Sequence, residues 1–326
     1  MNTYLRFLSR AGAFALLLPA CAAFAQSEST ALEWLERIYS ATQKLNYTGT
    51  FVYQHGQHVE TSHITHLVDS SGPHEKVETL DGEPREVVRT GDEVVCYLPG
   101  SMTMKVDKQP GRPAFPEILP RQLDELSASY DVKKGEVERV AGYECQTVIL
   151  EPRDHMRYGH QLWADRHTGM LLKAKTLDDG NRVLEQFTFT QLKIGGNIAS
   201  GSVRPRWAGK GARWRVEDSD ASRADLAQAG WVVRSSPPGF HTVAELIRTL
   251  GGTSGVGHIV LSDGIAAVSV FIEPISGKGP VQQAGLVRQG VTNVYMRPVG
   301  NYRVTVVGEA PPESVKYIAN AVEFRK

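Results

Sequence analysis

The spacing of apolar and polar residues divides the chain into helical and strand-like regions. Thr30 and Glu33 form a capping-box pattern, and the apolar residues that follow recur at helical spacing, which predicts a helix that ends before Asn46. From Tyr47 to about Leu192 the pattern changes to short runs rich in Val, Thr, Tyr and Phe, separated by turn-forming residues. We therefore expect an antiparallel meander of roughly eight to eleven strands in this region.

The segment from Asp107 to Arg121 interrupts the meander. Its prolines exclude both a helix interior and a hydrogen-bonded strand, so the segment is predicted to be a long loop. A short helix is expected to follow at residues 121–128, where Leu123 and Leu126 would cover one open face of the sheet.

Two more helices are predicted near the C-terminus. Thr242 and Glu245 repeat the capping-box pattern, and the apolar positions after them end at Gly251-Gly252, which predicts a helix over this stretch. A closing helix is expected to begin at Pro312, because proline is favoured at the first helical position. Its predicted buried face consists of Val315, Ile318, Ala319 and Val322.

The pattern also predicts where the domains divide. Asp263-Gly264 and Gly300-Asn301 indicate hairpins, which together with the helices make the C-terminal part a small α+β domain. Residues 195–211 are rich in Gly, Ser, Pro and Arg, a composition typical of a linker. The expected fold class is mainly β with α+β, and the expected divisions are an N-terminal domain at 26–196, a linker at 197–211 and a C-terminal domain at 212–326.

The first 25 residues have the three regions of a secretory signal peptide. Arg6 and Arg10 flank an apolar run, and Ala23-Phe24-Ala25 is a small-x-small cleavage site. A lipoprotein signal that anchors Cys21 is the alternative, although Pro19 fits that pattern poorly. After cleavage no apolar run reaches the roughly 18 to 20 residues of a membrane helix. The mature chain is therefore expected outside the cytoplasm.

Charge and cysteine content restrict the function further. Lys plus Arg equals Asp plus Glu, at 36 each, so no net field favours nucleic acid as a partner. Only Cys96 and Cys145 remain after cleavage, and they are either a disulfide or two buried free thiols. Neither interpretation makes them catalytic, because the sequence specifies no cationic partner that would activate a thiol.

Residue clusters that carry catalysis or metal binding are weak in this chain. Four histidines lie between His55 and His66, but His63 and His66 differ by an odd number and should point to opposite faces of a strand. The glycines at 251–257 follow a predicted helix and lack the ending of a phosphate loop. We therefore expect no catalytic residue, no metal and no cofactor.

Aromatic residues give a more specific prediction. Phe51 and Tyr53 share one strand face, as do Phe187 and Phe189, and Trp163 lies on a strand before a turn. The ordinary interpretation is a sheet core. A single curved sheet also has one concave face to fill, and an apolar hollow there would suit acyl chains. The five aromatic residues are therefore expected to line such a hollow.

Linked sequence blocks then point to a family. The first half contains YTGTFVY at 47–53, DGEPREVVR at 81–89 and PRDHMRYG at 152–159. The second half contains PPGF at 237–240, DG at 263–264, SVFIEP at 269–274 and VVGE at 306–309. Together these blocks resemble the RseB/MucB family of periplasmic sigma-E regulators, in the same order and over nearly the whole mature chain.

The resemblance implies a fold and a function. It implies an N-terminal half-barrel similar to lipoprotein carriers, with a curved antiparallel sheet around helices, joined to a smaller partner-binding domain. It implies that the protein binds the periplasmic segment of a single-pass anti-sigma factor, shields it from the site-one protease, and is released by lipid signals such as lipopolysaccharide or lipoprotein acyl chains. A periplasmic lipid or lipoprotein carrier is the alternative function, and self-association stays open. We expect Trp231, Phe240 and Phe271 to contact the partner.

Overall fold

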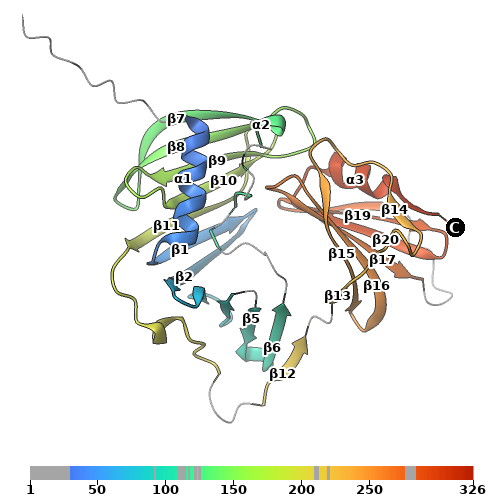
Figure 1. The fold of residues 1–326 in the computed structure, drawn as a ribbon, viewed down its shortest axis with the longest axis horizontal. Helices are drawn as coiled ribbons and strands as arrows, with labels where there is room; N and C mark the ends of the chain where they lie inside the picture. The colour runs from blue at the N-terminus through green and yellow to red at the C-terminus, as the bar shows by residue number, and fades with distance from the viewer. Residues whose placement is uncertain are drawn as a thin grey trace, which may run out of the picture.

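The computed structural model describes residues 30–91, 93–108, 115–116, 118–120, 123, 126–208, 213–218, 221–275 and 284–325. The predicted signal peptide, Cys21 and most of the predicted proline-rich loop lie outside the described residues. Within this range no helix is long and apolar enough to cross a membrane. The described chain forms a large curved sheet domain and a smaller sheet domain beside it (Figure 1).

The large domain is built on one 12-stranded sheet with the order β12-β6-β5-β4-β3-β2-β1-β11-β10-β9-β8-β7. Neighbouring strands are antiparallel, except that β12 runs parallel to β6. Its strands are β1 (Tyr47–His55), β2 (His58–Asp69), β3 (Gly72–Thr79), β4 (Glu86–Thr90), β5 (Glu93–Leu98), β6 (Thr103–Lys108), β7 (Tyr130–Val140), β8 (Tyr143–Pro152), β9 (Gly159–Asp165), β10 (Leu171–Leu177), β11 (Val183–Ile194) and β12 (Arg215–Asp218).

Two helices cover part of the concave face of this sheet. Helix α1 (Ala31–Lys44) has the predicted capping box, since Thr30 Oγ1 accepts from the Glu33 amide and the Glu33 carboxylate accepts from the Thr30 amide. Its buried residues Leu35 and Ile38 pack against the core beside β7, β8 and β10. The expected helix at 121–128 is seen as the short helix α2 (Leu126–Ser129), and Leu123 and Leu126 pack on the core as expected.

The small domain has a seven-stranded sheet with the order β13-β15-β16-β17-β20-β19-β18, beside the two-stranded pair β14-β21. Its core is covered by α3 (Pro312–Ala321), whose predicted buried residues Val315, Ile318 and Ala319 are fully buried. The strands are β13 (Ala221–Arg223), β14 (Trp231–Val233), β15 (His241–Leu250), β16 (Thr253–Ser262), β17 (Ala267–Pro274), β18 (Gly285–Gln289), β19 (Thr292–Val299), β20 (Tyr302–Gly308) and β21 (Val322–Phe324). The overall fold class expected from the sequence is confirmed.

The predicted helix over 242–250 is wrong, because these residues form strand β15. Glu245 does not close a capping box with Thr242; its carboxylate accepts from the Leu226 amide instead. Gly251 and Gly252 have φ angles of +56° and +83°, so the pair forms a tight hairpin turn into β16 rather than a helix end. Pairing with β16 along the whole strand outweighs the helical spacing of its apolar residues.

The described part of the predicted linker, residues 197–208, packs on the large domain. The short 3-10 helix η3 (Ser200–Val203) packs on β2 and β3, and the Arg206 amide donates to the buried carboxylate of Glu86. Strand β12 then extends the large sheet beyond β6. The chain therefore leaves the large domain only after Asp218, rather than at residue 211.

Candidate functional site

Four of the five predicted hollow-lining residues lie together on the concave face. Phe51 and Tyr53 of β1 stand opposite Phe189 and Phe187 of β11. The rings of Phe51 and Phe189 meet edge to face, with centroids 5.8 Å apart. Phe51, Phe187 and Phe189 are buried, whereas Tyr53 is half-buried. These rings form a continuous aromatic cluster.

The chain itself covers this cluster. Phe115 stacks on Phe51 with ring centroids 4.4 Å apart and meets Phe187 at 4.9 Å. Its carbonyl oxygen accepts a hydrogen bond from the Tyr47 hydroxyl, 3.0 Å away. The aromatic face is therefore filled by a phenylalanine of the predicted proline-rich loop, a residue to which the sequence interpretation gave no role.

Trp163 does not belong to this cluster. It alternates along β9 with Leu162, so the two side chains lie on opposite faces of the sheet. Leu162 stands beside Ala174 and Val148, whereas the indole of Trp163 lies under the ammonium groups of Lys173 and Lys175, at 4.3 and 5.3 Å from the ring centroid. The expectation that Trp163 lines the concave face is corrected, because it cannot share a face with its neighbour Leu162.

The polar end of the aromatic cluster contains Tyr53, Glu185 and His55. The Tyr53 hydroxyl donates to Glu185 at 2.6 Å, and His55 lies 3.8 Å from the same carboxylate. Burial and the neighbouring carboxylate raise the pKa of Tyr53 well above its usual value, so it stays a neutral hydrogen-bond donor. This end of the cluster adjoins the small domain, where His55 Nε2 lies 3.0 Å from the Gln289 carbonyl oxygen.

The two cysteines are free thiols in the structure. Cys96 lies on β5 and Cys145 on β8, on opposite sides of β1 in the sheet order, so the expected alternative of a disulfide between them is not formed. Burial raises the pKa of both thiols, that of Cys145 to about 12. Thiols with raised pKa values are poor nucleophiles, in agreement with a packing role.

The histidines of β2 are separated as the strand alternation predicted. His63 lies within hydrogen-bond distance of the Thr48 and Thr50 hydroxyls. His66 lies on the other face, where it stacks on Tyr47 at 4.9 Å. Burial lowers the pKa of His66, so the ring is neutral near pH 7. Among the described residues these side chains do not converge on a common metal position.

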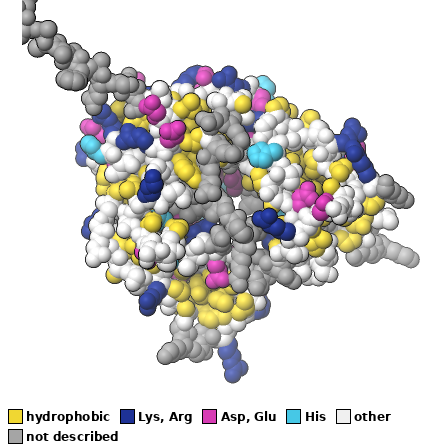
Figure 2. All heavy atoms as spheres, viewed as in Figure 1, with side chains coloured by type: hydrophobic (Ala, Val, Ile, Leu, Met, Phe, Trp, Pro, Cys, Tyr) yellow, Lys and Arg dark blue, Asp and Glu magenta, His cyan; other side chains and the backbone are white. Residues whose placement is uncertain are grey.

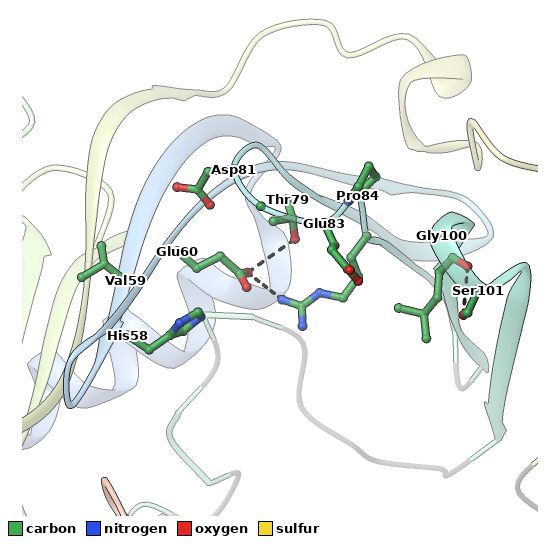
Figure 3. A pocket seen from close by; sticks show the side chains of 12 residues that line it. His58, Val59, Glu60, Thr79, Asp81, Glu83, Pro84, Gly100 and Ser101 are labelled. Atoms are coloured by element: carbon green, nitrogen blue, oxygen red, sulfur yellow. Dashed lines mark hydrogen bonds and ion pairs between the residues drawn. The ribbon is translucent and has the colours of Figure 1, made fainter.

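A pocket of about 530 Å³ opens where β2 begins and where β3 and β5 end (Figure 3). Arg85 Nη2 donates to Glu60 Oε1, 2.6 Å away. Asp81 accepts from the Thr61 amide, and these hydrogen bonds hold the pKa of Asp81 below its usual value. The Glu60 and Arg85 charges neutralise each other, so this pocket has the character of a stabilised loop junction rather than of an acid and base pair.

The expected partner-binding residues are differently placed. Trp231 and Phe240 are 6% and 4% exposed and belong to the small-domain core, so a partner cannot reach them in this arrangement. That part of the expectation is corrected, since aromatic residues near a linker are also those that a small domain needs for its core. Phe271 is half-buried and stacks on His258 at 4.4 Å, and it stays a prediction.

The surface carries no single-sign patch on the described part of the face drawn in Figure 2, where acidic and basic side chains are scattered among hydrophobic and neutral ones. This distribution agrees with the equal numbers of acidic and basic residues. Recognition of a partner therefore depends on shape and local contacts.

Both domains match known family models. Residues 30–207 match the MucB/RseB N-terminal domain and residues 225–323 match the MucB/RseB C-terminal domain. The chain belongs to the MucB/RseB family. The resemblance predicted from the sequence blocks is confirmed, because the two models together cover most of the chain in the expected order.

Relatives and solved structures agree with this membership. The chain is 32% identical to the sigma factor AlgU regulatory protein MucB of Pseudomonas aeruginosa, over 91% of this chain and 92% of that protein. It is 26% identical to the sigma-E factor regulatory protein RseB of Escherichia coli, over 89% of each. A crystal structure of MucB in complex with MucA(peri) covers 91% of this chain and 99% of its own, with 29% identity and a TM-score of 0.70.

Two further MucB structures allow a finer comparison. A second MucA/MucB complex from P. aeruginosa gives a TM-score of 0.72, whereas MucB alone gives 0.63. The expected class of the protein, a periplasmic regulator of the sigma-E type, is confirmed by these matches.

Proposed function

We propose that this protein binds the periplasmic segment of a membrane anti-sigma factor and shields that segment from site-one proteolysis. The observation that carries the proposal is the match of both domains, in order, to MucB structures solved with MucA(peri). A match over both domains favours a regulator over a simple lipid carrier, because a carrier would not need the second domain.

The arrangement of the two domains supports the same proposal. The chain gives higher TM-scores with the two MucB complexes than with MucB alone. We therefore take the arrangement described above as the partner-binding one.

The test is co-purification of the mature protein with the periplasmic part of its cognate anti-sigma factor. We expect a stable complex under both reducing and oxidising conditions, because the two cysteines are free and buried or half-buried. A shuffled version of the segment is the matched control, and the site-one protease should cut the bound segment more slowly than the free one. Absence of any complex would remove the proposal.

Release by a lipid signal is the second part of the proposal. It is supported by the aromatic cluster on the concave face, where Phe115 occupies an apolar position that an acyl chain would also fit. A chain of 14 carbons would contribute about 11 kcal/mol on burial, before ordering costs. Such a ligand opposes the partner only if the two favour different arrangements of the protein.

A competition titration separates this regulator from the alternative of a lipid carrier. An acylated ligand is added to the preformed complex, and the affinity for the anti-sigma segment is measured at each concentration. We expect the affinity to fall as the ligand saturates. Binding of the ligand with unchanged partner affinity would favour the carrier alternative for the large domain.

A further inference from the structure

The small domain is held against the large one through the loop between β8 and β9. The Met156 carbonyl accepts a hydrogen bond of 2.6 Å from the Ser314 hydroxyl. The Tyr158 hydroxyl accepts one of 3.0 Å from the Asn293 amide. Arg157, between them in sequence, is fully buried and donates a hydrogen bond to Asp263 of the small domain.

The Arg157 guanidinium bonds to both domains at once. On its own side, Nε and Nη2 donate to the two oxygens of Asp154, at 3.0 and 3.1 Å. Across the junction, Nη1 donates to Asp263 at 2.9 Å and Nη2 donates to the Pro238 carbonyl. The rings of Tyr130 and Phe240, one from each domain, lie 5.7 and 5.6 Å from the guanidinium carbon.

Asp263 divides its two oxygens between the hairpin and the junction. Oδ1 accepts from the amides of Ile265 and Ala266 and shapes the turn between β16 and β17, whereas Oδ2 accepts from Arg157. The same turn places Ile265 against the core of the large domain. The hydrogen bonds that shape the turn, the ion pair with Arg157 and the packing of Ile265 therefore depend on one another.

Three of the sequence blocks that carry the family resemblance meet at this point. They are PRDHMRYG at 152–159, PPGF at 237–240 and DG at 263–264. Outside this junction they share no element of either sheet. Their common feature in the fold is Arg157.

The ion pair between Arg157 and Asp263 contributes more to the orientation of the two domains than to the free energy of their association. A buried ion pair gains little over an apolar contact of the same size, because the lost hydration offsets the attraction between the charges. The planar guanidinium, however, donates its hydrogen bonds only in fixed directions. When the domains separate, water replaces these hydrogen-bond partners, whereas Ile265 leaves the apolar core of the large domain.

We infer that Arg157 is a positioning residue that fixes the small domain in the orientation required to bind the anti-sigma segment. This inference rests on the proposed function and adds the residue that sets the domain orientation. The domain orientation can be measured on the free protein and the affinity on the complex, so the two properties are tested separately.

The test compares full-length mature Arg157→Met with the control Arg166→Met, whose arginine is half-exposed and pairs with Glu144 within the large domain. Small-angle scattering of the free protein should show a larger radius of gyration for Arg157→Met only. The affinity for the anti-sigma segment should fall about tenfold or more, which is the loss expected if at most about one molecule in ten keeps the binding orientation.

A second variant separates positioning from stability. Removal of Arg157 leaves the Asp263 charge buried without its partner, which lowers the melting temperature. In Arg157→Met/Asp263→Asn the uncompensated charge is gone and the amide oxygen still serves the hairpin, so the melting temperature should recover while the scattering and the affinity stay altered. Recovery of all three properties together would reduce Arg157 to a structural role and overturn the inference.

The variant Gly239→Ala disturbs the same junction without removing a charge. The φ angle of Gly239 is +81°, and an added Cβ would lie 2.6 Å from Ser129 Oγ and 3.3 Å from Arg157 Nη1, across the junction. We expect the same opening as in Arg157→Met. Unchanged scattering and unchanged affinity in both variants would contradict the inference. If the wild-type protein binds no anti-sigma segment, the proposed function fails, and the scattering of the free variants still decides the orientation.

Discussion

The two domains each bury one face of an antiparallel sheet, but they do so with different material. Among the described residues of the small domain one regular helix, α3, covers the sheet, and its buried side chains are fully enclosed. In the large domain α1 contacts β7, β8 and β10, and the aromatic rings of β1 and β11 are covered by Phe115, which lies in a turn. A helix cannot leave its sheet without losing the core, whereas a single loop side chain can.

The difference teaches where adaptability is located. The core of the small domain is covered by a helix, whereas the aromatic face of the large domain is covered by the side chain of Phe115. The proposed regulator, which holds a partner and responds to a lipid, would use the small domain for the first property and the large domain for the second.

The largest loss of stability is expected when a buried side chain of α3 is shortened. Ile318→Ala removes a fully buried side chain of α3 and should lower the free energy of unfolding by about 3 kcal/mol. Urea denaturation followed by tryptophan fluorescence measures the loss. Tyr317→Ala, at a position 42% exposed on the same helix, is the control and should change little. Equal losses in both variants would show that α3 does not cover the core as described.

Removal of the Phe115 ring should cost less stability and should increase the affinity for an acylated ligand. Phe115→Ala removes a half-buried ring and should cost about 2 kcal/mol, roughly half of what a fully buried phenylalanine contributes. The same change vacates the aromatic cluster, so an acylated ligand should bind more tightly by fluorescence titration. Weaker ligand binding by the variant would contradict the idea that Phe115 occupies the ligand position.

Acidification tests each domain through one histidine whose pKa is lowered. Burial lowers the pKa of His160 in the large domain and of His258 in the small domain to about 4. Because the unfolded chain takes up these protons at higher pH than the folded one, stability falls as the pH drops from about 7 toward 4. At pH 5.5 each group should cost roughly 1.4 kcal/mol relative to neutral pH.

The check on this pH dependence is a pair of variants measured by urea denaturation at pH 7.5 and 5.5. His160→Gln should reduce the acid sensitivity of the large domain and leave that of the small domain, and His258→Gln should do the reverse. An acid sensitivity that is the same in the wild type and both variants would assign it to other groups.

The smallest effect is expected at the start of α1. Thr30→Ala removes one half of the capping box and should cost about 1 kcal/mol, since one helix amide loses its side-chain acceptor. Thr30→Ser keeps the hydroxyl and is the control. A thermal shift in the serine variant as large as that in the alanine variant would show that the cap contributes nothing.

The sequence predicted best where local chemistry decides. The capping box at Thr30, the proline start of α3 and the hairpin at Gly300-Asn301 were found because each is set by the conformational preferences of a few adjacent residues. The family blocks predicted the class of function for the same reason, since each block is a short local pattern.

Prediction failed where distant pairing decides. Residues 242–250 have helical spacing, but strand partners in β16 that no local pattern reveals make them a strand. Trp163 was placed on the concave face only from its position on a strand before a turn, whereas the face of its side chain follows from the register of every strand between β9 and β1. Arg157 was part of a recognised block, yet only the fold places it beside Asp263.

The parallel strand β12 has a consequence for the behaviour of the protein in concentrated solution. A sheet edge with free amides and carbonyls invites pairing with another chain and hence aggregation. At one end of the large sheet the four-residue strand β12 covers the β6 edge and becomes the edge itself, and at the other end β7 carries the sequence KKGEVER at 133–139 with a register shift between Lys134 and Val137. One edge strand is therefore short, and the other is charged and irregular, and both features oppose pairing with another chain. Removal of β12 would expose the longer edge of β6 and should therefore increase self-association through this edge.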